Sequence, residues 1–239
     1  QVVMYKFAIG SVAVALLFYA VGCQSTESTE SEPSQSASTS ASPSASTAAA
    51  SVPTDAKDVS PLGEGDRAPQ LTVRNPDGQD VSTAKLFSKA PTVLVFYRGA
   101  WCPYCNKHLA EIAGAHADLK ALGYQVVGVS PDRPAELKGS IEKDNLPYAL
   151  ISDSDMAFSH AFGLGFRVDD ATVHKYKNSY KIDLEKSSGY THHQLPVPAV
   201  YIVDTKGVIQ FAQWDPNYKT RLSAEAILAA AKQIKEDAH

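Results

Sequence analysis

The sequence predicts an α/β fold with a mixed central sheet and helices on both of its faces. Two continuous apolar runs, PTVLVFY (91–97) and QVVGVS (125–130), have the composition of strands that are buried on both faces. The segment between them, PYCNKHLAEIAGAHADLKAL (103–122), carries leucine and isoleucine at helical spacing. Crossover helices followed by a terminal hairpin produce a sheet with both parallel and antiparallel strand pairs.

The other elements can be placed in chain order. LTVRNPDGQDVS is typical of a small hairpin that turns at Asp77 and Gly78. RPAELKGSIEKDN predicts a second, more polar helix, and YALIS predicts a short strand. Two further strands, AVYIVD and VIQFA, are joined by a hairpin turn over 204–207. SAEAILAAAKQIKEDA is expected to be a closing helix with Ser223 as its N-cap.

The N-terminal segment, 1–23, has the features of an export signal. Lys6 precedes an uncharged, mostly apolar stretch from Phe7 to Val21, and small residues stand before Cys23. The ending AVGC resembles a bacterial lipoprotein signal, in which the cysteine receives lipid and becomes the mature N-terminus. A transmembrane anchor is the alternative, although the stretch is short for a span of ~20 residues. Either interpretation predicts an exported protein, anchored on the extracytoplasmic side in the periplasm or at the cell surface.

Residues 24–60 are rich in Ser, Thr, Ala and Pro and contain no aromatic residue. This composition cannot form a core, so it predicts a disordered tether. The tether holds five acidic residues and one lysine, in a chain whose net charge is −4. The remaining domain, 61–239, is therefore close to neutral, and no basic excess points to a nucleic acid partner.

Two of the three cysteines, Cys102 and Cys105, lie where the apolar run gives way to the predicted helix. Pro103 occupies the first helical position, which proline favours. A thiolate at a helix N-terminus meets free backbone N–H groups and the positive end of the helix dipole, and both lower its pKa. Cys105 lies one turn further on the same face. We interpret the pair as a nucleophile with a resolving partner; a static disulfide or half of a zinc site are the alternatives, although no second CxxC is present.

These motifs resemble those of a known family. WCPYC is similar to the active-site dithiol of thioredoxin-fold oxidoreductases, and GEGDRAPQLTV (63–73) to the N-terminal hairpin of peroxiredoxins. Together with LPVPAVYIVDTKGVIQFA and DPNYKTR, they resemble a peroxiredoxin-like subgroup of the alkyl hydroperoxide reductase/thiol-specific antioxidant (AhpC/TSA) family, from about Gly63 to the C-terminus. The resemblance implies a thioredoxin-like fold with a peroxiredoxin-type N-terminal hairpin, and an antioxidant thiol peroxidase without a cofactor.

The resemblance also implies roles for single residues. Cys102 would attack a peroxide or a disulfide, and Cys105 would resolve the intermediate to an intramolecular disulfide. A thioredoxin-like or small-thiol reductant would then reset the pair. Pro198 maps onto the cis-proline that presents backbone to the substrate, and Trp101 is expected to shape the same groove.

Two departures from the family pattern concern the peroxide. Gly99 stands where typical peroxiredoxins have a threonine, and LPVPAVYIVD contains no arginine. Arg98 is therefore the candidate donor to the peroxide, although an arginine at a strand end is more often a surface charge. We expect slow peroxide reduction, and a periplasmic thiol–disulfide reductase is the alternative function.

A copper-handling chaperone is a second alternative, which would use Cys102, Cys105 and a histidine such as His192 or His193. The cysteine spacing argues against it, and a histidine pair in a polar loop is usually solvated. We predict no metal site. The segment 163–195 is long for a plain loop, and is expected to form short helical pieces beside the active site that help to select the partner.

Replacing the predicted lipidated residue, Cys23→Ser, should release the protein from membranes because the atom that carries the lipid is lost. The activity of the soluble domain should be unchanged, since Cys23 has no redox role. Membrane fractionation and a peroxidase assay on the released protein measure the two effects. A variant that stays in the membrane fraction would contradict the lipoprotein interpretation and favour a transmembrane anchor.

Overall fold

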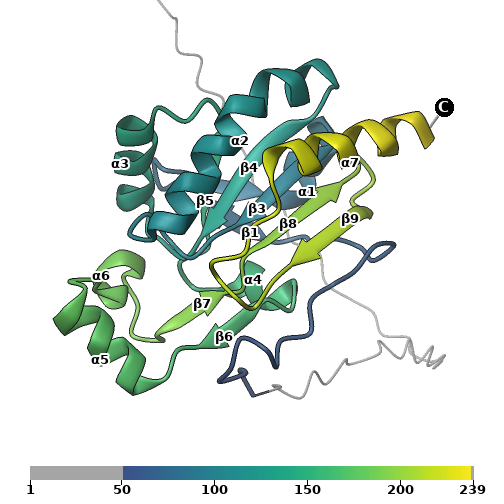
Figure 1. Ribbon diagram of the computed structural model, residues 1–239. Helices are drawn as coiled ribbons and strands as arrows, with labels where there is room; N and C mark the ends of the chain where they lie inside the picture. The colour runs from purple at the N-terminus through teal and green to yellow at the C-terminus, as the bar shows by residue number, and fades with distance from the viewer. Residues whose placement is uncertain (1–50, 238–239) are drawn as a thin grey trace, which may run out of the picture. The chain divides into compact units, whose positions relative to one another are not determined.

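A seven-stranded sheet organises residues 51–237, the part of the chain that the computed structural model describes (Figure 1). The strand order is β2-β1-β5-β4-β3-β8-β9. The strands are β1 (Thr72–Arg74), β2 (Asp80–Ser82), β3 (Thr92–Phe96), β4 (Gln125–Ser130), β5 (Ala149–Ser152), β8 (Ala199–Val203) and β9 (Ile209–Trp214). β3, β4 and β5 run parallel, whereas β8 pairs with β3 and β9 with β8 in antiparallel orientation. The predicted mixed sheet and its terminal hairpin are thereby confirmed.

Helices cover both faces of this sheet, as predicted. The helices in the described part of the chain are α1 (Thr83–Lys89), α2 (Pro103–Ala121), α3 (Pro134–Asp144), α4 (Ala157–Ala161), α5 (Asp170–Ser179), α6 (Leu184–Ser188) and α7 (Ala224–Asp237), of which α5 and α6 pack in a separate small cluster. Figure 1 shows α2 and α7 side by side over one face. α3 packs with them, while α1 and α4 contribute to the core on the opposite face. The closing helix is capped as predicted, since the Ala226 N–H donates to Ser223 Oγ over 3.2 Å.

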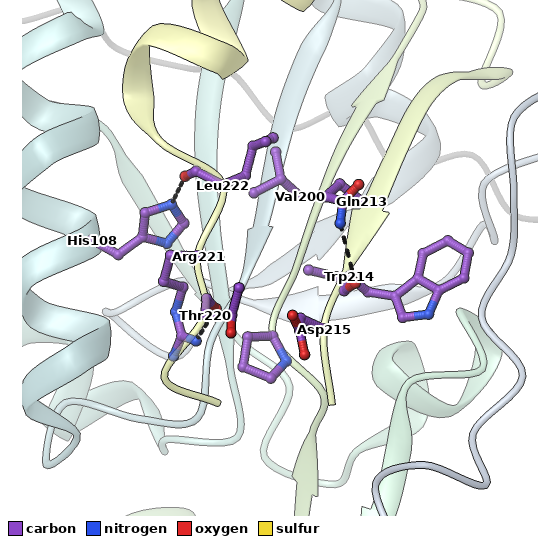
Figure 2. Close-up of a pocket in the computed structure, with 10 residues that line it drawn as sticks. His108, Val200, Gln213, Trp214, Asp215, Thr220, Arg221 and Leu222 are labelled. Atoms are coloured by element: carbon purple, nitrogen blue, oxygen red, sulfur yellow. Dashed lines mark hydrogen bonds between the residues drawn. The ribbon is translucent and has the colours of Figure 1, made fainter. Parts of the chain in front are cut away.

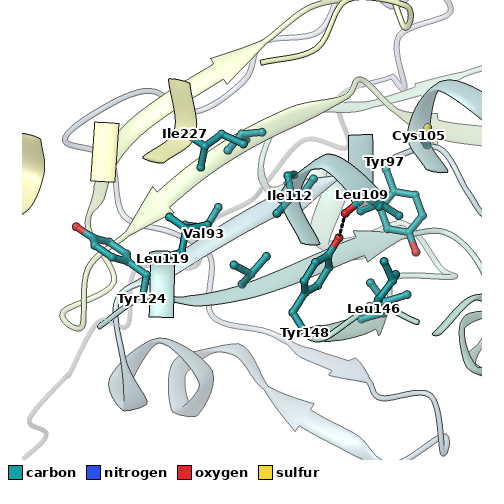
Figure 3. Close-up of a cluster of buried hydrophobic side chains, with 14 of the residues drawn as sticks. Val93, Tyr97, Cys105, Leu109, Ile112, Leu119, Tyr124, Leu146, Tyr148 and Ile227 are labelled. Atoms are coloured by element: carbon teal, nitrogen blue, oxygen red, sulfur yellow. Dashed lines mark hydrogen bonds between the residues drawn. The ribbon is translucent and has the colours of Figure 1, made fainter. Parts of the chain in front are cut away.

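The core between the sheet and helices α2 and α7 is built from apolar side chains, which helical spacing places along the sheet-facing side of each helix. Ile112 and Ile227 are completely buried against Val93 of β3 (Figure 3). Each such side chain contributes roughly 1.5–3 kcal/mol through burial of apolar surface. Cys102 and Cys105 both belong to this cluster, so the pair lies in the core rather than at the surface.

The core on the other face is aromatic at the point where β3 ends. Phe96 packs against Phe162, with ring centroids 4.9 Å apart, and against Phe158 at 5.7 Å. Tyr201 of β8 completes the cluster. These contacts hold the end of β3, from which the chain continues into the cysteine motif.

The N-terminal hairpin is confirmed, with β1 and β2 antiparallel and Gly78 at φ +80° in the turn. Helix α1, which follows the hairpin directly, was not predicted. It is seven residues long and begins where Ser82 accepts a hydrogen bond from the Lys85 N–H. A helix this short carries too few turns for a periodic pattern to indicate it.

The segment 163–195 forms two helices and, with Pro196, a separate two-stranded sheet. α5 and α6 agree with the expectation of short helical pieces. The antiparallel pair of β6 (Gly165–Arg167) and β7 (Gln194–Pro196) was not predicted, because its partners are about thirty residues apart and each strand has three residues. β7 leads through Pro198 into β8, so this pair fixes the entry to the central sheet.

Residues 51–60 belong to the predicted tether, but they lie against the domain. The Arg167 N–H donates to the Pro53 carbonyl over 2.7 Å, and Ala56 and Val59 pack on the aromatic core. These small apolar residues attach the C-terminal end of the predicted tether to the domain. The average composition of the tether does not reveal this contact. The apolar stretch 7–21, Cys23 and the tether up to residue 50 lie outside the described residues. Between residues 51 and 237, no helix has both the length and the apolar character needed to cross a membrane.

Candidate active site

Cys102 occupies the N-cap of α2, directly after the loop that leaves β3. Its backbone is extended, with φ −92° and ψ 111°, and its N–H donates to the Gly99 carbonyl over 3.1 Å. The Cys102 carbonyl accepts the first two helical hydrogen bonds, from the N–H groups of Cys105 and Asn106, each over 3.0 Å. The side chain is 1% exposed. The predicted position at the start of the helix is thus confirmed.

Hydrogen bonding from the Cys105 thiol is the main influence that lowers the pKa of Cys102, to about 6. Burial opposes this shift, and the Cys105 backbone N–H and the charges of Arg98 and Arg221 add to it. The Cys102 sulfur makes no regular N-cap hydrogen bond with the helix backbone. The prediction of a low pKa therefore holds, but its chief cause is the neighbouring thiol rather than the helix terminus alone.

Cys105 has the opposite environment, one turn further along the helix. Its side chain is completely buried, and this burial raises the pKa of the thiol well above the ordinary value. The neighbouring Cys102 raises it further, while the charge of Arg221 lowers it. Arg221 Nη2 donates to Cys105 Sγ over 3.4 Å. At neutral pH, Cys102 is therefore the thiolate and Cys105 the thiol.

Arg98 is a buried cation rather than a surface charge. Its side chain is 5% exposed, and its Nη1 lies 3.9 Å from Cys102 Sγ. The guanidinium stands over the rings of Tyr218, Trp101 and Tyr176, at 4.1, 5.0 and 5.6 Å from their centroids. Its Nη2 also donates to the Tyr176 hydroxyl. This arrangement can present a fixed positive charge and N–H donors beside the reacting sulfur.

Gly99 is required by the backbone and by its neighbours. Its φ is +139°, and a Cβ at this position would lie 2.4 Å from Trp101 Nε1. The Ala100 N–H donates to Asp132 Oδ2 over 2.8 Å, and the Ser130 hydroxyl donates to the same oxygen over 3.0 Å. Burial raises the pKa of Asp132 to about 7. The loop before Cys102 is therefore held by a buried carboxyl group and has no room for the threonine of other peroxiredoxins.

A cleft of about 260 Å³ opens beside Arg98. Its wall combines the 54–56 segment, the β6/β7 sheet, α5 and the connections before β8 and after β9, and it includes Pro198. The lining residues are Thr54, Asp55, Ala56, Arg98, Phe166, Val168, Asp169, Thr172, Tyr176, Leu195, Pro196, Pro198, Pro216 and Tyr218. Trp101 is not among them. It packs against Arg98 and Tyr176, so it supports the groove rather than lining it.

Four residues of this site were not predicted. Tyr176 comes from α5, Tyr218 and Arg221 from the connection between β9 and α7, and Asp132 follows β4. Tyr218 and Arg221 belong to the motif DPNYKTR, which contributed to the family resemblance without an assigned role. None of these positions has a local signal, because the sheet topology alone brings them to the cysteine pair.

The histidines proposed for copper are engaged elsewhere. His192 Nε2 lies 2.9 Å from the Ser154 carbonyl, and His193 Nε2 lies 2.9 Å from a carboxylate oxygen of Glu185. Among residues 51–237, no group of three His, Cys, Asp or Glu side chains could hold a metal ion. The geometry therefore gives the copper-chaperone alternative no support.

Comparison with known proteins decides the family. The model of the AhpC/TSA family matches residues 64–212, which is more than half of the chain. The chain belongs to the AhpC/TSA family. A putative peroxiredoxin, bcp, of Haemophilus influenzae is 33% identical over 106 residues, which cover 44% of this chain and 68% of that protein. The chloroplastic peroxiredoxin Q of Gentiana triflora is 31% identical over 103 residues, covering 43% of this chain but only 47% of the relative. The predicted peroxiredoxin-like thiol peroxidase is thereby confirmed.

Solved structures show the same AhpC/TSA architecture. Peroxidoxin BcpB from Mycobacterium tuberculosis superposes with a TM-score of 0.56 at 19% identity, over 72% of this chain and 98% of that one. Reduced Prx3 from Vibrio vulnificus, in complex with hydrogen peroxide, gives 0.58 at 22% identity, over 71% and 99%. At these identities the likeness establishes the fold, and the predicted thioredoxin-like fold is confirmed.

The two cysteines should react at different pH. Alkylation of the reduced protein should label Cys102 first, with a rate that rises as its thiol ionises, around pH 6, and levels off above pH 7. Cys105 should remain unlabelled over this range, because burial keeps it protonated. Peptide mapping after short pulses of iodoacetamide measures both rates. Labelling of Cys105 ahead of Cys102 would reverse the assignment.

Restoring the family threonine, Gly99→Thr, should impair the protein rather than improve it. The side chain would collide with Trp101 and would require a positive φ, so we expect the free energy of unfolding to fall by about 1–3 kcal/mol. Gly114→Ala in α2 is the matched control, because its Cβ meets no atom within 4 Å. It should leave stability unchanged or raise it by about 0.5–1 kcal/mol. Urea unfolding of both variants tests this, and a stable Gly99→Thr protein with a faster peroxide reaction would contradict the steric argument.

Proposed function

We propose that this peroxiredoxin-like thiol peroxidase works through a Cys102–Cys105 disulfide. The Cys102 thiolate attacks the O–O bond, an S–O bond forms, and the expelled oxygen leaves as an alcohol or water after it takes up a proton. The Cys105 thiolate then attacks the Cys102 sulfenic acid, which forms the disulfide and releases hydroxide as water. An external thioredoxin-like or small-thiol reductant, itself oxidised to a disulfide, returns both cysteines to thiols.

The opposite pKa shifts of the two cysteines carry this proposal. A pKa of about 6 makes Cys102 a thiolate at neutral pH, and the thiolate is the nucleophile. Cys105 stays protonated in the core, so it does not compete for the peroxide. Its position one turn along α2 keeps it within reach of the Cys102 sulfur. These environments favour attack by Cys102 first and resolution by Cys105 second.

Arg98 takes the place of the donors that stabilise the leaving oxygen in typical peroxiredoxins. The position of the family threonine is Gly99, which has no hydroxyl to offer. Arg98 Nη1 lies 3.9 Å from the Cys102 sulfur and Arg98 also lines the cleft, so its guanidinium can donate to a peroxide oxygen there. A single donor group in place of two supports slow peroxide reduction compared with typical members of the family.

Thiol–disulfide exchange is the second candidate function. Attack on a disulfide requires a low-pKa thiolate and an accessible groove, but no donor to a leaving oxygen. Cys102 supplies the thiolate, and Arg98, which lies 3.9 Å from its sulfur, lines the cleft together with Pro198. The same cleft could admit either the disulfide substrate or the reductant of the peroxidase cycle.

We also propose that the protein acts on the extracytoplasmic side of a membrane, attached by lipid at Cys23 and by the tether that follows. The apolar stretch ending in AVGC supports this location. A tethered peroxidase would meet peroxides and thiol partners close to the membrane surface. The Cys23→Ser variant tests this attachment independently of the chemistry.

Substituting the proposed donor, Arg98→Met, should slow peroxide reduction far more than disulfide reduction. Loss of a donor to a developing oxyanion typically costs roughly a hundredfold or more in rate, whereas disulfide attack uses no such donor. Stopped-flow oxidation of the reduced protein by hydrogen peroxide, an organic hydroperoxide and a model disulfide measures the three rates. The rates are compared near pH 9, because this is above the ordinary thiol pKa of ~8.5 and Cys102 is then mostly ionised with or without Arg98.

The matched variant is Arg98→Lys, which keeps a positive charge but loses the planar donor pair. It should fall between wild type and Arg98→Met. Equal losses in the peroxide and disulfide reactions would show that Arg98 supports only the thiolate or the fold. A wild-type protein that reduces the disulfide but none of the peroxides would exclude the peroxidase and leave the second candidate.

A further inference from the structure

The connection between β9 and α7 brings a second arginine to the cysteine pair. Arg221 Nη2 donates to Cys105 Sγ over 3.4 Å, and its Nη1 donates to the carbonyls of Thr220, over 2.7 Å, and of Tyr218. The side chain lines a cavity of about 110 Å³ with His108 of α2 (Figure 2). The guanidinium is thereby held at the sulfur of the resolving cysteine.

The charge of Arg221 is not neutralised by an acidic partner. Among the residues that the structure describes, no ion pair includes it, although Asp215 lines the same cavity. His108 donates from Nε2 to the Leu222 carbonyl over 2.8 Å, and burial lowers the pKa of this histidine to about 4. His108 is therefore neutral at physiological pH. Arg221 and Arg98 are the cations that influence the two sulfurs.

Cys105 needs a nearby cation because its proposed role requires a thiolate, whereas its buried environment disfavours one. A thiol must lose its proton to attack a sulfenic acid, and it must leave as a thiolate when a reductant opens the disulfide. Burial in the core makes this anion unfavourable, which is why the pKa of Cys105 is raised. A guanidinium N–H directed at the sulfur offsets part of that cost, since charge-assisted hydrogen bonds are about twice as strong as neutral ones.

We propose that Arg221 is a catalytic residue of the second half of the cycle, in which it stabilises the Cys105 thiolate during resolution and during re-reduction. This inference rests on the proposed role of Cys105 as the resolving cysteine. In re-reduction, a thiolate of the external dithiol attacks the Cys102 sulfur, the Cys102–Cys105 bond breaks, and Cys105 leaves as a thiolate beside Arg221. The second thiol of the reductant then breaks the mixed disulfide. Arg98 serves the first step at Cys102, and Arg221, whose charge also favours the Cys102 thiolate, directs its N–H donor at Cys105.

A purely structural role for Arg221 predicts a different pattern of defects. Its contacts to the Tyr218 and Thr220 carbonyls hold the connection, and Tyr218 covers the guanidinium of Arg98 at 4.1 Å. If Arg221 only shaped this connection, its loss would disturb Arg98 and slow the attack on peroxide. Stabilisation of the Cys105 thiolate predicts instead that, at a pH where Cys102 is ionised in both proteins, the attack is nearly unchanged and resolution is slow.

The test is quenched-flow oxidation of reduced Arg221→Met by hydrogen peroxide, with mass spectrometry of the thiol, sulfenic acid and disulfide forms. We expect sulfenic acid formation within about threefold of wild type and disulfide formation at least about tenfold slower, which is the scale of a lost charge-assisted hydrogen bond. The Cys102 sulfenic acid should accumulate, react with dimedone, and proceed to sulfinic acid at high peroxide. The resolution rate should also require a higher pH. The charged or titratable groups around this site include Cys102, Arg98, His108, Asp215 and Tyr97, and the substitution retains all of them.

Two variants serve as controls. Lys219→Met removes a neighbouring positive charge that contacts no sulfur and should resolve at the wild-type rate, while Arg221→Lys should recover part of the resolution rate. Equal losses in both steps of Arg221→Met, or resolution at the wild-type rate, would overturn the role of Arg221. Wild-type protein that forms no Cys102–Cys105 disulfide would instead show that the proposed cycle is wrong.

Discussion

The guanidinium of Arg98, enclosed by three aromatic rings, is the feature on which the geometry of the active site depends. A buried cation needs compensation, and among the described residues no carboxylate pairs with Arg98. The faces of Trp101, Tyr176 and Tyr218 and the Tyr176 hydroxyl supply this compensation. Because no acidic residue neutralises it, its charge remains available to the Cys102 sulfur. The rings come from three separate segments, so α5 and the connection after β9 form part of the active site rather than peripheral additions.

The loop before Cys102 shows how the site can depart from the family pattern and remain ordered. Gly99 leaves room for Trp101, which in turn supports Arg98. Asp132 holds the backbone at Ala100 through a hydrogen bond from the Ala100 N–H to its carboxyl group. The hydroxyl donor of the family is thus exchanged for a stacked cation. A threonine side chain at position 99 would collide with the Trp101 ring that packs on Arg98, so this site cannot hold both the threonine and the stacked arginine.

The two cysteines illustrate how strongly the surroundings of a buried thiol distinguish chemically identical groups. Cys102 lies at the end of α2, where a thiol donor and two arginines favour its anion. Cys105 lies one turn further in the same apolar cluster (Figure 3), where burial and the neighbouring Cys102 make its anion unfavourable. The difference in pKa assigns the order of events without any difference in residue type. The buried Cys105 sulfur accepts a hydrogen bond from Arg221, the contact on which the proposed role of this arginine in resolution rests.

The sequence by itself determined the order of the main strands and helices, the position of Cys102 at a helix N-terminus, and the spacing that places Cys105 one turn away. These features depend on local propensity, apolar periodicity and capping, which neighbouring residues encode. It missed α1 and the β6/β7 pair, since such short elements carry no measurable period. Only the tertiary structure decided that Tyr176, Tyr218 and Arg221 converge on the cysteine pair. They arrive through strand order and loop packing across more than seventy residues, and contacts of that range are set by the whole core rather than by any local pattern.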